Sequence, residues 1–186
     1  ECEPNQIAYK PEEINKNTNA YIGSWNMEIF QKIRNYPNIQ HLFESFPDKK
    51  IFMQALETNP AINSPQKAET ALTRENIYLT DWCKDILYKT EFSKEIQNYE
   101  LVRFTVSQLG FPNGATTQEI YDKAEKLGLE LCPAEVGPHL RLQYPGKEYF
   151  WIAMKQITGR GGDSGVFYLG RGSGQLGLGG NGAGPG

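Results

Sequence analysis

The sequence predicts an α+β fold, with an antiparallel sheet and one packed helix in the C-terminal half. Apolar and polar residues alternate over residues 101–106, a pattern typical of a strand. Over residues 116–127 the apolar residues return at helical spacing instead. The chain has 186 residues, of which 39% are hydrophobic and 22% are charged, so it can bury a core. This composition excludes wholesale disorder, collagen and coiled coil.

The N-terminal half is predicted to hold a flexible arm, a helix and a hairpin. Residues 1–20 are polar and contain prolines, which indicates a flexible arm. Ser24 or Asn26 then caps a helix that reaches about Asn35, because apolar side chains crowd one side of it. Residues 39–46 and 50–56 flank a Pro-Asp-Lys turn signal and predict a β-hairpin.

Two further helices complete this N-terminal unit. The Ser-Pro pair at residues 64–65 places proline at a first helical position and predicts a helix start. Residues 77–79 are predicted to be extended or a tight link. Thr80 or Asp81 caps the next helix, which continues to about residue 89. We therefore expect a helix–hairpin–helix–helix unit over residues 21–91.

The second half is predicted to form a separate α+β unit over residues 101–169. Thr116 and Glu119 have the spacing of a capping box, and Gly128 can end the helix that follows. Residues 140–144 and 149–157 flank Pro-Gly, a turn pair that predicts a hairpin. Residues 165–169 are expected to add a strand.

The C-terminal end is rich in glycine, with 13 of the 19 glycines in residues 159–186. Glycine loses much entropy on ordering and buries no side chain, so we expect a mobile tail over residues 170–186. A degraded strand is the alternative. Residues 172–177 match G-x-G-x-x-G, but dinucleotide binding needs a helix afterwards, and these glycines leave no room for one.

Reactive side chains concentrate in residues 132–141. Pro133, Gly137 and Pro138 are expected to prevent a regular helix and to form a constrained loop. Such a loop would present its polar side chains to a protein or small-molecule partner. We therefore predict a binding site made of Cys132, Glu135, His139 and Arg141. The alternative is a small hydrolase or transferase in which Cys132 is the nucleophile and His139 is the base.

Two other candidate sites carry less weight. Tyr149 and Trp151 alternate with Phe150 and Ile152, and one interpretation is that one strand face offers an aromatic platform to a base, a sugar or a peptide. Ser164 lies in a Gly-Asp-Ser-Gly segment similar to the nucleophile segment of chymotrypsin-like proteases, and His41 and Asp81 precede it in that family's order. We expect Ser164 not to be a nucleophile, because a glycine-rich loop cannot hold it against a base.

The remaining composition predicts no cofactor and no metal site. The cysteines at positions 2, 83 and 132 include no close pair, which argues against a disulfide framework or a zinc site and favours the cytoplasm. Export after removal of a signal is the alternative. No apolar run is long enough for a membrane span. The net charge of −3 makes nucleic-acid binding unlikely, so a nucleic-acid accessory factor is the weaker alternative function.

Residues 127–144, LGLELCPAEVGPHLRLQY, resemble a segment found in a group of small bacterial proteins. Residues 38–41 and 109–111 are similar as well, and the resemblance covers about residues 21–170. It implies no activity, cofactor or catalytic residue. The sequence as a whole therefore predicts a bacterial, non-catalytic binding or accessory protein.

Overall fold

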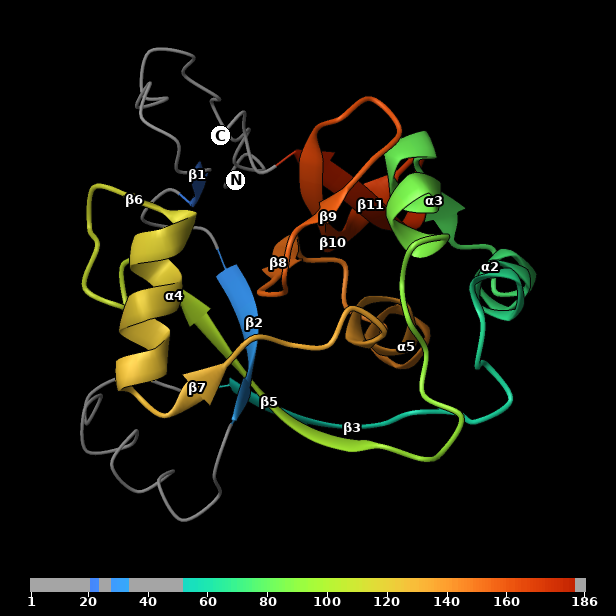
Figure 1. The fold of residues 1–186 in the computed structure, drawn as a ribbon, viewed down its shortest axis with the longest axis horizontal. Coiled ribbons are helices and arrows are strands. Elements are labelled where there is room, and N and C mark those ends of the chain that lie inside the picture. The colour runs from blue at the N-terminus through green and yellow to red at the C-terminus, as the bar shows by residue number, and fades with distance from the viewer. Residues whose placement is uncertain (1–20, 24–27, 34–51, 183–186) are drawn as a thin grey trace.

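The computed structural model describes residues 21–23, 28–33 and 52–182 (Figure 1). The α+β fold class is confirmed. Among the described residues, nine strands form one mixed sheet, in which the order along the main path is β3-β5-β2-β8-β10-β11-β4. The strands of this path are β2 (Glu28–Ile33), β3 (Phe52–Glu57), β4 (Tyr78–Leu79), β5 (Asn98–Thr105), β8 (Phe150–Ile152), β10 (Ser164–Gly172) and β11 (Gln175–Gly182). Short strands β7 (Leu129–Glu130) and β9 (Ile157–Thr158) pair with β2 and β10.

Strands from both halves of the chain share this sheet. Strand β2 pairs antiparallel with β5 and parallel with β8, and β4 pairs parallel with β11. The expected division into units 21–91 and 101–169 therefore runs through the middle of the sheet. A separate two-stranded pair joins β1 (Tyr21–Gly23) to β6 (Ala115–Thr116).

The helix expected from residue 24 or 26 to residue 35 is wrong where the structure describes it. Residues 28–33 form β2, whose five-residue antiparallel register with β5 includes the pair Gln31 and Val102. A short apolar run fits a helix or a buried strand equally well, and the pairing on both sides decides for the strand. Of the expected hairpin, only the second half is described, as β3, and residues 39–46 lie outside the described residues.

Three predicted helices are confirmed: α2 (Pro65–Arg74), α3 (Asp81–Leu87) and α4 (Thr117–Lys126). Each begins at the expected side-chain cap. The Oγ of Ser64 accepts from the backbone N–H of Lys67, and the Oγ1 of Thr80 accepts from that of Cys83. The predicted capping box at the start of α4 has both of its hydrogen bonds, with Glu119 accepting from the N–H of Thr116 at 2.8 Å. Strands β5 and β10 confirm the two predicted strands at 101–106 and 165–169.

The hairpin strand expected at residues 140–144 is wrong, because residues Val136–Gln143 form helix α5. Pro138 is the third residue of this helix, where a backbone N–H has no intrahelical partner, so proline costs nothing there. Gly137 is required for a different reason. A Cβ at this position would lie 2.6 Å from the Phe167 ring, so glycine lets α5 approach β10 closely.

The mobile tail expected at residues 170–186 is wrong for residues 170–182, which form a β-hairpin of β10 and β11. The connecting residues Ser173 and Gly174 have φ angles of +52° and +80°, the two positive values of a type I′ turn. Aromatic rings cover the glycine backbone. A Cβ on Gly179 would lie 2.0 Å from the Tyr168 ring, and one on Gly170 would lie 2.8 Å from Tyr149. The rings therefore supply the buried surface that the glycines lack.

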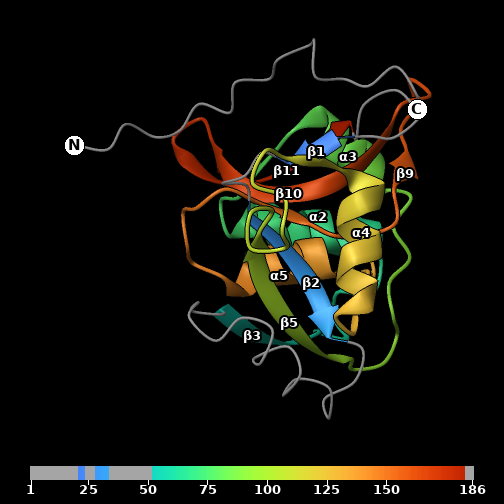
Figure 2. The ribbon, with the colours of Figure 1, turned by 90° about the vertical axis from the view of Figure 1, so that its left-hand side faces the viewer.

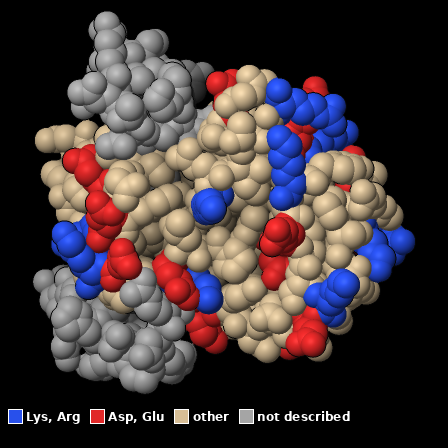
Figure 3. All heavy atoms as spheres, in the orientation of Figure 1, with Lys and Arg blue, Asp and Glu red and all other residues tan. Residues whose placement is uncertain are grey.

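Helices cover the sheet from both sides. Helices α4 and α5 lie on opposite sides of β2 (Figures 1 and 2), and α2 packs against α5. On the α5 side, Arg103 lies over the Phe150 ring and donates to the hydroxyl of Tyr144. No helix of the described residues is long and apolar enough to cross a membrane. On the face shown in Figure 3, acidic and basic side chains are interspersed.

Candidate functional site

Three of the four predicted site residues lie in α5 or at its first end, and all three are buried. Glu135, His139 and Arg141 are 3%, 1% and 1% exposed, and Cys132 is also buried. The expectation of an exposed loop that presents these side chains is therefore wrong. The reason is the helix itself, since its residues 136–141 pack between the sheet and α2. Each residue has its own surroundings, and His139 lines a pocket.

Arg141 holds the chain that leaves the helix. Its Nη2 donates to the backbone oxygens of Tyr144 and Gly146, and its guanidinium lies 6.0 Å from the centroid of the Tyr144 ring. Burial lowers the pKa of Arg141, and the charge of Glu148 partly opposes that shift. This geometry gives Arg141 a role in fixing residues 144–146.

Cys132 lies apart from His139 in its interactions. Its backbone N–H donates to the oxygen of Ala153 at 2.7 Å, and burial raises the pKa of its thiol to about 12. The thiol is therefore protonated at neutral pH and is a poor nucleophile. Neither ring nitrogen of His139 bonds to it, since Nδ1 accepts from Asn59 and Nε2 has no partner. The structure does not form the Cys132–His139 pair that the hydrolase hypothesis requires.

Glu135 ties the start of α5 to the segment before β5. One carboxylate oxygen accepts from the backbone N–H of Ser93 at 2.8 Å, and the other accepts from the hydroxyl of Tyr99 at 3.0 Å. Burial, together with this hydrogen bond, raises the pKa of Tyr99. The carboxylate therefore holds Ser93 and Tyr99 against the start of α5.

His139 is a buried, neutral histidine with one unused donor. Its Nδ1 accepts from the backbone N–H of Asn59 at 3.4 Å, which assigns the ring proton to Nε2. Burial lowers the pKa of His139, while the nearby Glu135 carboxylate opposes that shift. The ring of Phe92 meets it edge-on at 6.1 Å between centroids. Nε2 is one of eight buried side-chain N and O atoms of the described residues that have no hydrogen-bond partner.

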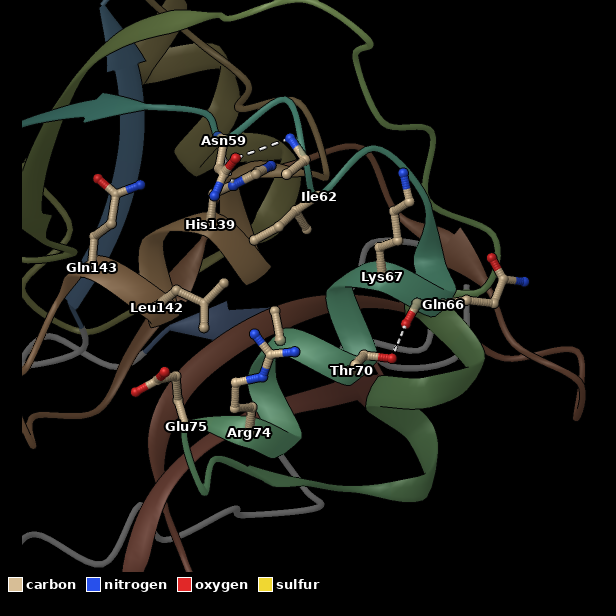
Figure 4. A pocket seen from close by; sticks show the side chains of 12 residues that line it. Asn59, Ile62, Gln66, Lys67, Thr70, Arg74, Glu75, His139, Leu142 and Gln143 are labelled. Atoms are coloured by element: carbon tan, nitrogen blue, oxygen red, sulfur yellow. Dashed lines mark hydrogen bonds between the residues drawn. The ribbon is translucent and has the colours of Figure 1, made fainter.

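His139 forms part of the wall of a pocket of about 580 Å³ between α2, α5 and the turn after β3 (Figure 4). The lining residues come from these three segments: Asn59, Ala61, Ile62, Gln66, Lys67, Thr70, Ala71, Arg74, Glu75, His139, Leu142 and Gln143. Pockets of about 300–1,000 Å³ are the usual size for small-molecule sites. The pocket is thus large enough for a small organic ligand.

The pocket combines aliphatic walls with donor groups. Ile62, Ala71 and Leu142 supply the aliphatic surface. In Figure 4 the guanidinium of Arg74 extends into the pocket on the side of Leu142. Among the residues that the structure describes, Arg74 makes no hydrogen bond or ion pair. Most of the other lining residues are polar or charged, so the pocket offers an aliphatic part and a polar part to a ligand.

The sequence analysis missed all of the pocket except His139. Lys67, Thr70 and Arg74 share one face of α2, three and four residues apart, and this spacing was a visible signal. It is also the pattern of any solvent-exposed helix face. Only the packing of α5 against α2 turns that face into one side of a cavity.

The aromatic platform is not formed as expected. Phe150, Trp151 and Ile152 are all buried, because β8 lies inside the sheet and both of its faces are covered. Tyr149 is 36% exposed, and its ring packs on Tyr168 at 4.8 Å between centroids and at 6.2 Å from Trp151. These rings mainly fill space beside the glycines of β10 and β11.

The protease-like segment and the cysteines also have structural positions. Ser164 begins β10, and its Oγ lies 3.0 Å from the Oγ1 of Thr158, while His41 lies outside the described residues. Cys83 and Cys132 are buried cysteines that form no disulfide. Within the described parts of the chain, no three His, Cys, Asp or Glu side chains are grouped so that they would hold a metal ion.

Comparison with protein-family models, curated proteins and solved structures gives no match to this chain. The resemblance to a group of small bacterial proteins therefore stays a prediction. The pocket between α2 and α5 is the feature of the structure that bears on function.

Proposed function

We propose that the chain is a non-catalytic binding protein whose small-molecule ligand occupies the pocket between α2 and α5. The observation that carries the proposal is the 580 Å³ pocket, whose wall combines aliphatic side chains with the Arg74 guanidinium, which has no partner among the described residues. Of the four residues predicted from the sequence, His139 lies in the wall of this pocket. Glu135 fixes Ser93, the residue after the Phe92 ring that meets His139 edge-on.

The rigidity of the pocket supports this role. Its walls are α2, which is capped at Ser64, and α5, which packs against α2. In the turn after β3, the Oδ1 of Asn59 accepts from the N–H of Ala61 at 2.9 Å, and the N–H of Asn59 donates to Nδ1 of His139. A preformed site loses little entropy when a ligand binds. Binding is favoured over catalysis because Cys132, the candidate nucleophile, is a buried thiol with a raised pKa.

Ligand-observed NMR with a library of small fragments tests the proposal. Ala71→Trp places an indole in the pocket, and Thr70→Trp does so from the neighbouring lining position. Thr73→Trp is the matched control, because Thr73 is exposed on the same helix and does not line the pocket. We expect fragments that bind the natural sequence and Thr73→Trp, and that lose binding in the two pocket variants.

Thermal unfolding of each variant shows whether it is folded before the binding data are compared. Two results contradict the proposal: the same fragments bind a folded pocket variant as well as the control, or no fragment binds the natural sequence. Either result would remove the pocket as the site.

A further inference from the structure

The polar wall of the pocket holds both donors and acceptors, and its two cations are Lys67 and Arg74. The Arg74 guanidinium offers up to five N–H groups and has no partner among the described residues. The Lys67 ammonium gives one bond to Asn63 Oδ1 at 2.9 Å, which leaves it two further protons. The Nε2–H of His139 is buried and does not face the open pocket. An acceptor group of a ligand therefore meets Arg74 and Lys67.

The charges in the lining limit the charge of that ligand. Lys67 and Arg74 are cations, His139 is neutral because burial lowers its pKa, and Glu75 is an anion. The Glu75 carboxylate points away from the Arg74 guanidinium in Figure 4. The wall thus carries one net positive charge, which matches a single negative charge better than two.

The positions of these groups separate a charged end from an apolar end. Arg74 lies at the C-terminal end of α2, and Lys67 lies two turns earlier, held by Asn63. Between them are Ala71 and, from the other two segments, Ile62 and Leu142. A planar carboxylate suits the fork of an arginine, and an aromatic or branched aliphatic body suits the aliphatic walls.

We propose that the ligand of this pocket is a small monocarboxylate with an apolar body, whose carboxylate binds Arg74. This inference rests on the proposed function, since it names the chemical class of the ligand for the same pocket. The carboxylate accepts from the guanidinium, and the apolar body lies between Ile62, Ala71 and Leu142.

The test uses three probes that share a phenyl ring and differ in the charge of the polar group: benzoate, benzamide and phenyl phosphate. Their dissociation constants are measured by NMR titration of the natural sequence, of Arg74→Gln and of Arg171→Gln. Arg171 is an exposed arginine of β10 outside this pocket, so it is the matched control. We expect benzoate to bind the natural sequence more tightly than either of the other probes does. We also expect the dissociation constant of benzoate to rise about tenfold or more in Arg74→Gln and to stay unchanged in Arg171→Gln.

Benzamide separates the failure of this inference from the failure of the proposed function. If benzamide or phenyl phosphate binds as tightly as benzoate, or if Arg74→Gln leaves benzoate binding unchanged, the monocarboxylate assignment is overturned. The proposed function survives that result as long as Ala71→Trp or Thr70→Trp removes fragment binding. If benzoate does not bind the natural sequence at all, the assignment is overturned as well.

Discussion

The α2–α5 pocket and the β10–β11 hairpin differ in how side chains fill the space beside them. In the pocket, helix faces with medium and long side chains leave about 580 Å³ unfilled and leave Nε2 of His139 without a partner. In the hairpin, glycines remove side chains and the rings of Tyr149 and Tyr168 take their place. The hollow beside Tyr168 has only about 20 Å³. Filled space indicates a structural role, and an open pocket large enough for a small molecule indicates a binding role.

This contrast predicts that substitutions in the two regions separate stability from binding. Residues that fill the hairpin should change the free energy of unfolding and leave binding to the folded protein intact. Substitutions of residues that line the pocket should change ligand binding and leave the free energy of unfolding nearly unchanged. The predictions below run from the largest expected change in stability to the smallest.

Trp151→Ala should have the largest effect. Trp151 is 4% exposed, and its ring meets those of Tyr149 and Tyr168, so its removal leaves a cavity beside the hairpin. We expect a loss of about 3–5 kcal/mol in the free energy of unfolding, measured with urea. A loss below about 1 kcal/mol would mean that the rings do not stabilise the hairpin.

Gly137→Ala should destabilise the protein by overpacking. The new methyl group would lie 2.6 Å from the fully buried Phe167 ring, so α5 or β10 must shift. We expect a loss of about 1–3 kcal/mol in urea unfolding. In a Phe167→Leu background, Gly137→Ala should lower the free energy of unfolding by less than it does in the natural sequence. Full additivity of the two substitutions would contradict the close contact.

His139 should make the stability depend on pH with a defined sign. Burial lowers its pKa in the folded state below the ordinary value of 6.5, so near pH 6 the unfolded chain binds more protons. The free energy of unfolding should therefore fall as the pH decreases from about 7 through the lowered pKa. In His139→Gln, which keeps an acceptor for the Asn59 N–H, the fall over this range should be smaller. Equal slopes in the two proteins would show that His139 is not buried in its neutral form.

Arg74→Gln should have the smallest effect on stability. Arg74 is exposed and makes no hydrogen bond or ion pair within the described residues, so we expect a change within about 0.5 kcal/mol in urea unfolding. A loss of several kcal/mol would assign Arg74 a structural role, and its effect on ligand binding would then need another explanation.

The sequence predicts what depends on local signals. Helices α2, α3 and α4 begin at the capping residues Ser64, Thr80 and Thr116, which can be identified from the sequence alone. It fails where distant segments decide the outcome. Strand β2 is fixed by pairing with β5 and β8, which come some 70 and 120 residues later along the chain.

Helix α5 and the glycine-rich hairpin show two further reasons for failure. Pro138 predicts a break in the helix when only the sequence is considered, although proline is tolerated in a first turn. The glycines of β10 and β11 predict a mobile tail, because nothing local in the sequence shows that aromatic rings from Tyr78, Tyr149 and Tyr168 cover them. The same limit applies to the site: His139 was found from its sequence context, but the pocket exists only once α2 and α5 pack together.

Chemical-shift mapping of the backbone amides during a benzoate titration tests the central claim most directly. The account predicts that the largest shifts lie at residues 59–62, along the pocket-facing side of α2, and at residues 139–143. The amides of β10 and β11 should stay unchanged. Shifts concentrated on the β10–β11 hairpin, or the absence of shifts around His139 and Arg74, would contradict the assignment of the pocket as the binding site.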